Sequence, residues 1–152
     1  MEDEIHVSIE RDADLVVARA EGRAMAHRLG FRPPDPTLIA TAISEVARNV
    51  VVHVGHGEII MRPLVDGRRL GVLVIARDEG EGIPDVDAAL GLGHASRGGL
   101  GLGLPGARRL MDEFEVESQL GKGTTVTMRK WRVRDELELL REKRKRRQSD
   151  PA

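Results

Sequence analysis

The sequence predicts an α+β fold, a two-layer α/β sandwich in which a mixed, largely antiparallel sheet carries its helices on one face. The N-terminal segment alternates apolar and polar residues, and two further pairs of short strand-like segments are separated by tight turns. Other, longer segments carry apolar residues at helical spacing. Hairpins require antiparallel pairing, and amphipathic helices need an apolar sheet face to cover. The 152 residues suffice for one domain with a buried core.

The N-terminal third is expected to hold one strand and two helices. IHVSIE at 5–10 alternates with period two and predicts the first strand. A helix follows over 15–31, with acidic residues before its start and a glycine near its end. Asp35 is the expected N-cap of the second helix, Pro36 its first residue, and Gly55 marks its end.

Two hairpins are expected in the rest of the chain. Strands over 57–65 and 70–78 flank the turn DGRR, and strands over 113–119 and 124–131 flank LGKG. A helix is expected over 104–114, between the two hairpins. The charged segment 134–148 predicts an exposed helix appended to the core, and SDPA after it is expected to fray. We therefore predict a folded domain over 1–132 and a charged helical extension over 133–152.

Composition excludes several classes of function. No apolar run approaches the ~20 residues of a membrane span, and the acidic N-terminus is unlike a signal peptide, so no membrane partner is expected. Without cysteine there are neither disulfides nor thiolate metal sites, in keeping with a cytoplasmic location. The net charge of −1 argues against a nucleic-acid binder, although 141–147 is a basic block.

The first candidate site lies in the segment ISEVARNVVVH at 43–53. Glu45 and Asn49 are four residues apart, so a helix places them on the same edge, beside its apolar stripe. The pair is either a solvated helix edge or part of a site.

The second candidate lies where a strand ends at RDEGEGIPD. Asp78 could accept a hydrogen bond from a ligand amine, and Gly80 and Gly82 would let the backbone approach that ligand closely. Taken alone, the segment also reads as an ordinary turn.

The third candidate is the glycine-rich segment 98–106, which leads directly into a helix. Backbone N–H groups at a helix start suit phosphate, but a flexible loop is the alternative. As a dinucleotide fingerprint the segment is weak, because no apolar strand precedes it. The segment GKGTT at 121–125 alone indicates only a hairpin turn.

Other chemistries find little support. His53 and His56 have no evident third metal ligand and are interpreted as polar residues at a helix end. Ser44 and Ser96 have no matching His and Asp partners for a hydrolase triad. The basic tail is interpreted as a solvated helix or a partner contact.

The order of these segments resembles the N, G1, G2 and G3 boxes of the GHKL (Bergerat-fold) ATPase and kinase superfamily. E-x-x-x-N on a helix is followed by D-x-G-x-G at a strand end, a glycine-rich lid and G-x-G-T-T. Within that superfamily, the segment from Gly98 to Trp131 resembles the RsbT-type serine/threonine kinases of the bacterial stressosome. The resemblance extends over about residues 5–132.

The resemblance implies a role for each matching residue. Asn49 would be a Mg²⁺ ligand, and Glu45 would activate the attacking hydroxyl or water. Asp78 would bind the adenine amino group, with Gly82 shaping the adenine pocket. The remaining residues implied in ATP binding are Gly80, Ile83, Gly98, Gly99, Leu100, Gly101, Leu102, Gly103, Thr124 and Thr125.

The implied function is ATP- and Mg²⁺-dependent phosphorylation of a serine on a STAS-domain antagonist or scaffold protein of the RsbS/RsbR type. The kinase would then activate a PP2C-type phosphatase of the RsbU type. Two alternatives stay open at this point. They are an anti-sigma-factor kinase of the RsbW/SpoIIAB type and a non-catalytic nucleotide-binding adaptor.

The sequence departs from the family pattern at two places. Glu81 stands where proline is common in D-x-G-P-G, and it adds negative charge near the nucleotide. HASR at 94–97 replaces the usual lid motif and could remove a hydroxyl contact, for which Arg97 could compensate.

Overall fold

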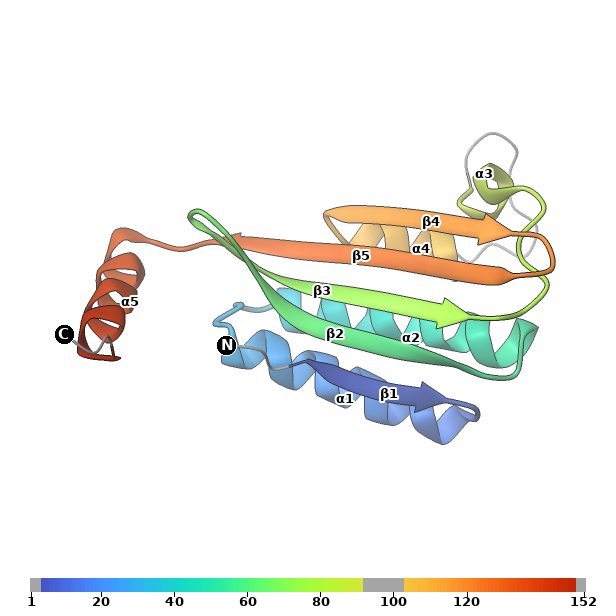
Figure 1. Cartoon of the computed structure of the whole chain (residues 1–152), viewed down its shortest axis with the longest axis horizontal. Coiled ribbons are helices and arrows are strands. Elements are labelled where there is room, and N and C mark those ends of the chain that lie inside the picture. The colour runs from blue at the N-terminus through green and yellow to red at the C-terminus, as the bar shows by residue number, and fades with distance from the viewer. Residues whose placement is uncertain (1–3, 92–102, 150–152) are drawn as a thin grey trace.

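The structure is a computed structural model that describes residues 4–91 and 103–149. Figure 1 shows its elements along the chain. They are β1 (Ile5–Ile9), α1 (Asp12–Arg28), α2 (Asp35–His53), β2 (Gly57–Asp66), β3 (Arg69–Asp78), α3 (Val86–Ala89), α4 (Leu104–Leu110), β4 (Glu113–Gln119), β5 (Gly123–Val133) and α5 (Glu136–Ser149).

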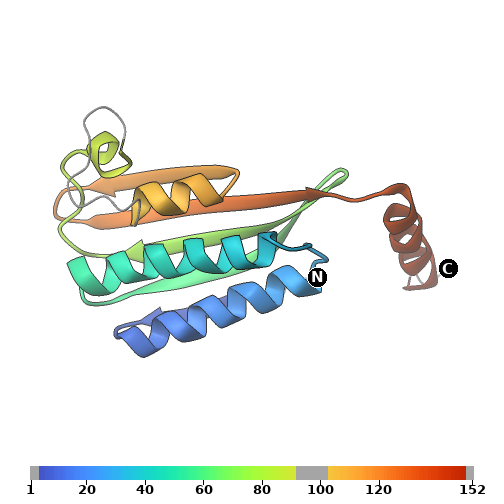
Figure 2. The ribbon, with the colours of Figure 1, turned by 180° about the vertical axis from the view of Figure 1, so that it is seen from behind.

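The five described strands form one open sheet in the order β1-β2-β3-β5-β4. Every neighbouring pair in this sheet is antiparallel. Helices α1, α2 and α4 cover one face of it, as the view from behind in Figure 2 shows. The predicted α+β sandwich is therefore confirmed, with a sheet that is antiparallel across all described pairings and not mixed.

Helix α2 forms the centre of the core because its apolar stripe faces the sheet. Ile39, Ile43, Val46 and Val50 are at most 4% exposed. Burying each such side chain contributes roughly 1.5–3 kcal/mol relative to leaving it in water. This burial fixes the rotation of α2 about its axis, and with it the direction in which Glu45 and Asn49 point.

Several predicted element boundaries differ from those of the structure. The first helix, predicted over 15–31, spans Asp12–Arg28. Asp35 is the first residue of α2, and the N-cap is Pro34. The fourth helix ends at Leu110 and not at 114, because Met111 is extended with φ −109° and ψ 159°. The backbone N–H of Asp112 already donates to the carbonyl of Arg129 on β5, at 2.9 Å. Sheet pairing thus overrides the helical pattern of the segment. No sequence pattern predicted the four-residue helix α3.

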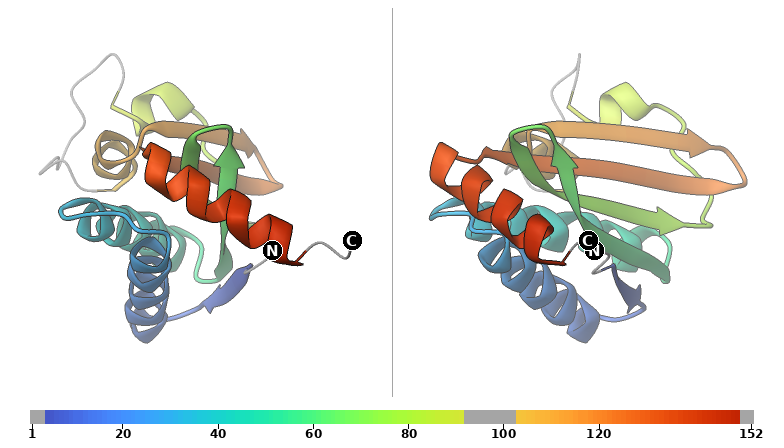
Figure 3. Two further views of the ribbon diagram at one scale, coloured as in Figure 1. Left: turned by 90° about the vertical axis from the view of Figure 1, so that its left-hand side faces the viewer. Right: turned by 60° about the vertical axis from the view of Figure 1, so that its left-hand side comes forward.

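The predicted C-terminal helix is present as α5. It lies at one end of the sheet, beyond the end of β5, as Figure 1 shows, and Figure 3 turns this end toward the viewer. No helix in the described part of the chain is both long and apolar enough to cross a membrane.

Candidate functional site

A cavity of about 520 Å³ opens at the end of the sheet where β3 ends and β5 begins. Its volume is within the usual range for small-molecule sites. Helices α2, α3 and α4 and the loop after β3 complete its wall. The lining residues are Val46, Asn49, Val50, His53, Val54, Ala76, Asp78, Glu81, Gly82, Ile83, Pro84, Ala88, Ala89, Gly103, Leu104, Pro105, Thr124 and Val126.

Helix α2 contributes one polar edge to this wall. Asn49 and His53 are four residues apart on the helix, and both line the cavity. Asn49 is half-buried, and a Cβ atom added to Gly103 would lie 3.7 Å from its side-chain oxygen Oδ1. The start of α4 therefore lies next to the Asn49 side chain. His53, interpreted from sequence as a helix-end residue, belongs to the cavity wall as well.

Glu45 lies one turn before Asn49 and is not part of the cavity wall. Its side chain is buried, and both of its carboxylate oxygens accept hydrogen bonds. Arg48 Nη1 donates to Oε1 at 3.2 Å, and the backbone N–H of Gly103 donates to Oε2 at 2.5 Å. The carboxylate thus connects α2 to the start of α4, a contact between residues 58 positions apart in the sequence.

Asp78 is the last residue of β3 and lies at the opposite side of the cavity. Its Oδ1 accepts the backbone N–H of Gly80 at 2.9 Å, which fixes the carboxylate and leaves Oδ2 available to a ligand. Gly123 packs against its backbone with φ +121°, and a Cβ there would lie 2.1 Å from the Asp78 carbonyl oxygen. Only glycine permits this approach.

The loop after Asp78 is held against the β4–β5 hairpin. Gly82 has φ +84°, and a Cβ there would lie 2.5 Å from the Gln119 carbonyl oxygen. The backbone N–H of Gly121 donates to the carbonyl of Glu81 at 2.8 Å. Gly80 is also crowded, since its Cβ would lie 2.7 Å from a methyl group of Val54. These glycines let the loop pack closely enough to form the cavity wall.

Ser118 is a positioning residue that the sequence did not reveal. Its hydroxyl oxygen accepts the backbone N–H of Ile83 at 2.7 Å and lies 2.9 Å from the hydroxyl of Thr124. It thereby joins the loop on one side of the cavity to β5 on the other. Ser118 lies outside the GKGTT segment, and only the pairing of β4 with β5 brings it opposite Thr124.

The two threonines of the GKGTT segment differ in their positions. Thr124 is 9% exposed and lines the cavity, whereas Thr125 follows on the same strand and is absent from the lining. Successive side chains of a strand point to opposite faces, so Thr124 is the one that faces a ligand in the cavity.

The predicted lid residues Gly98, Gly99, Leu100, Gly101 and Leu102 lie outside the described residues, as do HASR and Ser96. Of the predicted ligand-binding residues that are described, Asn49, Asp78, Gly82, Ile83, Gly103 and Thr124 line the cavity. Glu45, Gly80 and Thr125 do not, although Glu45 and Gly80 are hydrogen-bonded to residues that do. The roles assigned to these residues stay predictions.

Within the described residues there is no group of three or more His, Cys, Asp or Glu side chains that could hold a metal ion. The predicted Mg²⁺ ligand is a lone amide, Asn49. Such a ligand fits Mg²⁺ that is carried mainly by phosphate oxygens and water, because Mg²⁺ commonly takes only one or two protein ligands in nucleotide sites.

The fold and the cavity agree with the results of sequence comparison. A family described as "Histidine kinase-like ATPase domain" matches residues 9–130. The chain belongs to this family.

Within the family, the chain is related to a known protein kinase. It is 44% identical over 131 residues to "Serine/threonine-protein kinase RsbT" of Bacillus subtilis (strain 168), covering 86% of this chain and 98% of that protein. It is also 37% identical over 109 residues to "Anti-sigma F factor" of Thermoanaerobacter sp. (strain X514), covering 64% of this chain and 74% of that protein. The predicted resemblance to RsbT-type kinases is thus confirmed.

A solved structure supports the fold. The RsbU and RsbW domains of a Mycobacterium tuberculosis protein match with a TM-score of 0.56 and 22% identity, over 86% of this chain. The chain spans about one third of that longer chain, at 33%. At this identity the match bears on the fold alone.

Proposed function

We propose that this serine/threonine kinase works in an RsbT-type partner-switching module. It transfers phosphate from ATP to a serine of a STAS-domain antagonist or scaffold protein and then activates a PP2C-type phosphatase of the RsbU type. The observation that carries the proposal is the cavity in which Asn49, Asp78 and Thr124 converge from three different elements.

The cavity suits a nucleotide because apolar and polar residues line different parts of its wall. Ile83, Val126 and Val50 offer an apolar surface to a base, and Asp78 offers a fixed carboxylate oxygen to an amino group on that base. Asn49 offers an amide oxygen at the other side. There it would hold Mg²⁺, a hard ion that prefers oxygen ligands. Bound MgATP would supply the phosphoryl group, and its Mg²⁺ would neutralise the negative charge of the phosphate oxygens during transfer.

Glu45 is the proposed proton acceptor for the serine hydroxyl. Its Oε2 accepts the Gly103 N–H and its Oε1 accepts Arg48, and a carboxylate with two such bonds keeps lone pairs for a proton. Gly103 has φ +82° and directly precedes α4, so Glu45 is hydrogen-bonded to the residue that follows the proposed lid glycines in the sequence.

Phosphorylation would change which partner is bound. A phosphate added to the serine brings about two negative charges and new hydrogen-bond acceptors. A partner equilibrium shifts only if the kinase binds the modified and unmodified forms with different affinity. We propose that residues 1–132 carry this chemistry in the cytoplasm and that 133–152 is a separate extension.

An anti-sigma-factor kinase is the second candidate. The observation that favours it is the 37% identity to Anti-sigma F factor, against 44% to RsbT over a larger share of both chains. Titration with a purified cognate sigma factor distinguishes the two, since only the second candidate predicts a stable complex with it.

The proposal is tested by transfer of γ-labelled phosphate to a purified STAS-domain protein of the same organism. Wild type is expected to label a serine. Glu45→Gln, which keeps the side-chain shape, is expected to lose at least ~100-fold in rate, the usual contribution of a general base, while ATP affinity is retained. Glu117→Gln, at an exposed position of β4, is the matched control and should transfer normally.

Two results would contradict the proposal. Full transfer by Glu45→Gln removes that residue from the catalytic role. Absence of label with wild type, despite ATP binding and complex formation with the STAS-domain protein, indicates a non-catalytic adaptor instead.

A further inference from the structure

Helix α5 lies far from the nucleotide cavity. The cavity is formed where β3 ends and β5 begins, whereas α5 follows the other end of β5 (Figure 1). The 19 residues of α2 run between these two ends, a length of about 28 Å. The helix also lies beyond residues 9–130, which match the family. Accordingly, none of the residues that line the cavity belongs to α5.

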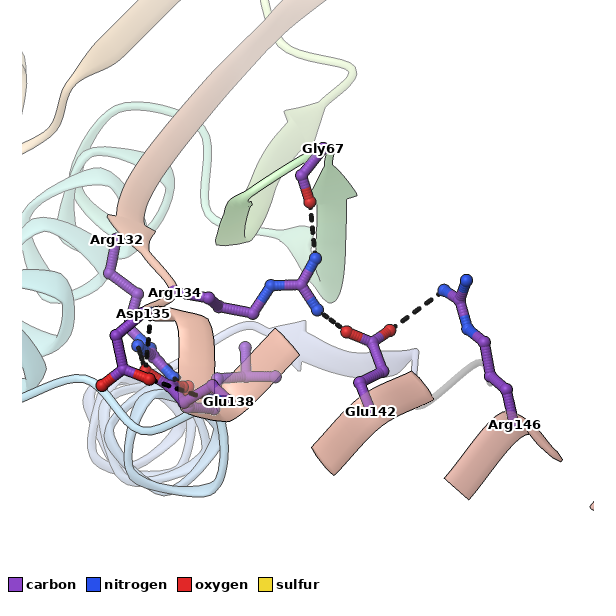
Figure 4. Close-up of polar contacts among 8 residues, drawn as sticks. Gly67, Arg132, Arg134, Asp135, Glu138, Glu142 and Arg146 are labelled. Atoms are coloured by element: carbon purple, nitrogen blue, oxygen red, sulfur yellow. Dashed lines mark hydrogen bonds and ion pairs between the residues drawn. The ribbon is translucent and has the colours of Figure 1, made fainter. Parts of the chain in front are cut away.

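One face of α5 is anchored to the domain by two arginines at the end of β5, as Figure 4 shows. Arg132 Nε donates to the carbonyl of Leu29 at 2.8 Å, and its two Nη atoms bind both carboxylate oxygens of Glu138. The Arg134 guanidinium binds Glu142. We call these two ion pairs the α5 clasp.

The clasp extends to the β2–β3 turn and along α5. Arg134 Nη2 donates to the carbonyl of Gly67 at 2.5 Å, and Glu142 also accepts from Arg146 at 3.0 Å. Arg134 is only 7% exposed, and a buried guanidinium is stable only while its partners are in place. The hydrogen bonds from Arg132 lower the pKa of Glu138 to about 2. A merely solvated tail would have no such contacts.

The opposite face of α5 points away from the domain. Since residues three, four and seven apart share a helix face, Leu137, Leu140, Arg141, Arg144 and Arg147 form one surface, here called the outer α5 face. Leu137 and Leu140 are 55% and 57% exposed, and the three arginines are exposed. The two acidic residues of the clasp lie on the other side, so they do not neutralise this surface.

The charge of this surface is opposite to that of the rest of the chain. Residues 141–147 contain six Lys or Arg and one Glu, whereas the whole chain has a net charge of −1, so the remainder is net negative. A phosphate backbone would use only the arginines of this face, whereas its exposed Leu137 and Leu140 suit the apolar side chains of a protein segment. A helix that lies on a lipid surface buries a broad apolar face of Trp, Phe or Leu, and the outer α5 face offers only two leucines.

We propose that the outer α5 face is a docking surface for an acidic, leucine-bearing segment of a partner protein. The leucines would pack against apolar side chains of that segment, and the arginines would pair with its carboxylates. The clasp holds this surface in a fixed orientation, which lowers the entropy lost on binding. The inference needs neither ATP nor catalysis and therefore stands or falls independently of the proposed function.

The test measures binding of a fluorescein-labelled 14-residue peptide of Leu and Glu in helical repeat to the full chain, without ATP and at 0.15 M salt. A peptide with Gln in place of Glu is the neutral probe. Wild type should bind the acidic peptide at least tenfold more tightly than the neutral one. Arg144→Glu with Arg147→Glu should lose at least tenfold, and Lys122→Glu, at an exposed residue of the β4–β5 turn, should bind as wild type.

The decisive variant is Glu138→Gln with Glu142→Gln. It releases the clasp but keeps every cation and raises the net charge by two. A fixed docking surface predicts binding at least threefold weaker than wild type, whereas a flexible basic tail predicts equal or tighter binding, which would overturn the proposal. Glu142→Gln alone replaces the double variant if circular dichroism shows unfolding. Tighter binding of duplex DNA or of phosphatidylglycerol vesicles than of the acidic peptide would also overturn it.

Discussion

The two ends of the sheet are stabilised in different ways. At the cavity end, Asp78, Gly82 and Gly123 are held mainly by backbone hydrogen bonds and close glycine contacts. At the other end, Arg132 and Arg134 form ion pairs with acidic residues of α5. The polar groups of the cavity keep hydrogen-bonding capacity for a ligand, whereas each arginine of the clasp is paired with a carboxylate.

This difference indicates which end does chemistry and which end supports an added element. A binding site needs fixed polar groups with unused acceptors, and backbone contacts can fix a side chain without engaging all of its atoms. A buried ion pair fixes geometry but uses the charges that it buries. The following two predictions test this comparison, the larger effect first.

The first prediction concerns the glycines of the β4–β5 turn. Gly123→Ala places a methyl group 2.1 Å from the Asp78 carbonyl oxygen at φ +121°, so we expect a loss of about 3 kcal/mol in the free energy of unfolding, near the upper limit for a strained backbone position. Gly121→Ala, with φ +79° and no atom within 4 Å of the added methyl, should lose only about 1 kcal/mol. Urea unfolding of both variants measures the difference; equal losses would show that close packing at Asp78 is unimportant.

The second prediction concerns the pH dependence of the clasp. The pKa of Glu138 is lowered from its ordinary value of 4.5 to about 2 by the hydrogen bonds from Arg132. A lowered pKa in the folded state stabilises the protein above the unfolded value, and this contribution is lost as pH falls. The stability difference between wild type and Glu138→Gln should therefore be constant above about pH 5 and shrink between 4.5 and 2. A difference that stays constant down to pH 2 would show that no such ion pair forms.

Much of the fold follows from local pattern. The apolar runs of β2 and β3 around the turn DGRR and the apolar stripe of α2 were sufficient to predict a hairpin and a central helix, since both depend on residues close in sequence. The end of α4 was not predictable, because Asp112 is drawn into the sheet by Arg129 on another strand.

Only part of the candidate site was predicted, because some of its contacts join residues that are far apart in the sequence. Asn49 and Asp78 each lie in a short motif with recognisable spacing, but Ser118 has no motif and acts through strand pairing. The hydrogen bond between Glu45 and Gly103 joins residues 58 positions apart. The clasp was also missed, because the sequence of α5 reads as a solvated charged helix until Arg132 and Arg134 are seen beside it.

The most direct test of the nucleotide site is a calorimetric titration of ATP and GTP, each with Mg²⁺, into wild type and Asp78→Asn. Asp78 is a hydrogen-bond acceptor fixed by Gly80, so it should bind the amino group of adenine and repel the carbonyl oxygen of guanine. Wild type is expected to bind ATP at least ~10-fold more tightly than GTP, and Asp78→Asn to lose ~10- to 100-fold for ATP, the value of a hydrogen bond to a charged group. Glu79→Gln, at the exposed neighbouring position, should bind as wild type. Equal affinity for both nucleotides, or an unchanged affinity of Asp78→Asn for ATP, would contradict the assignment of this cavity to the adenine of ATP.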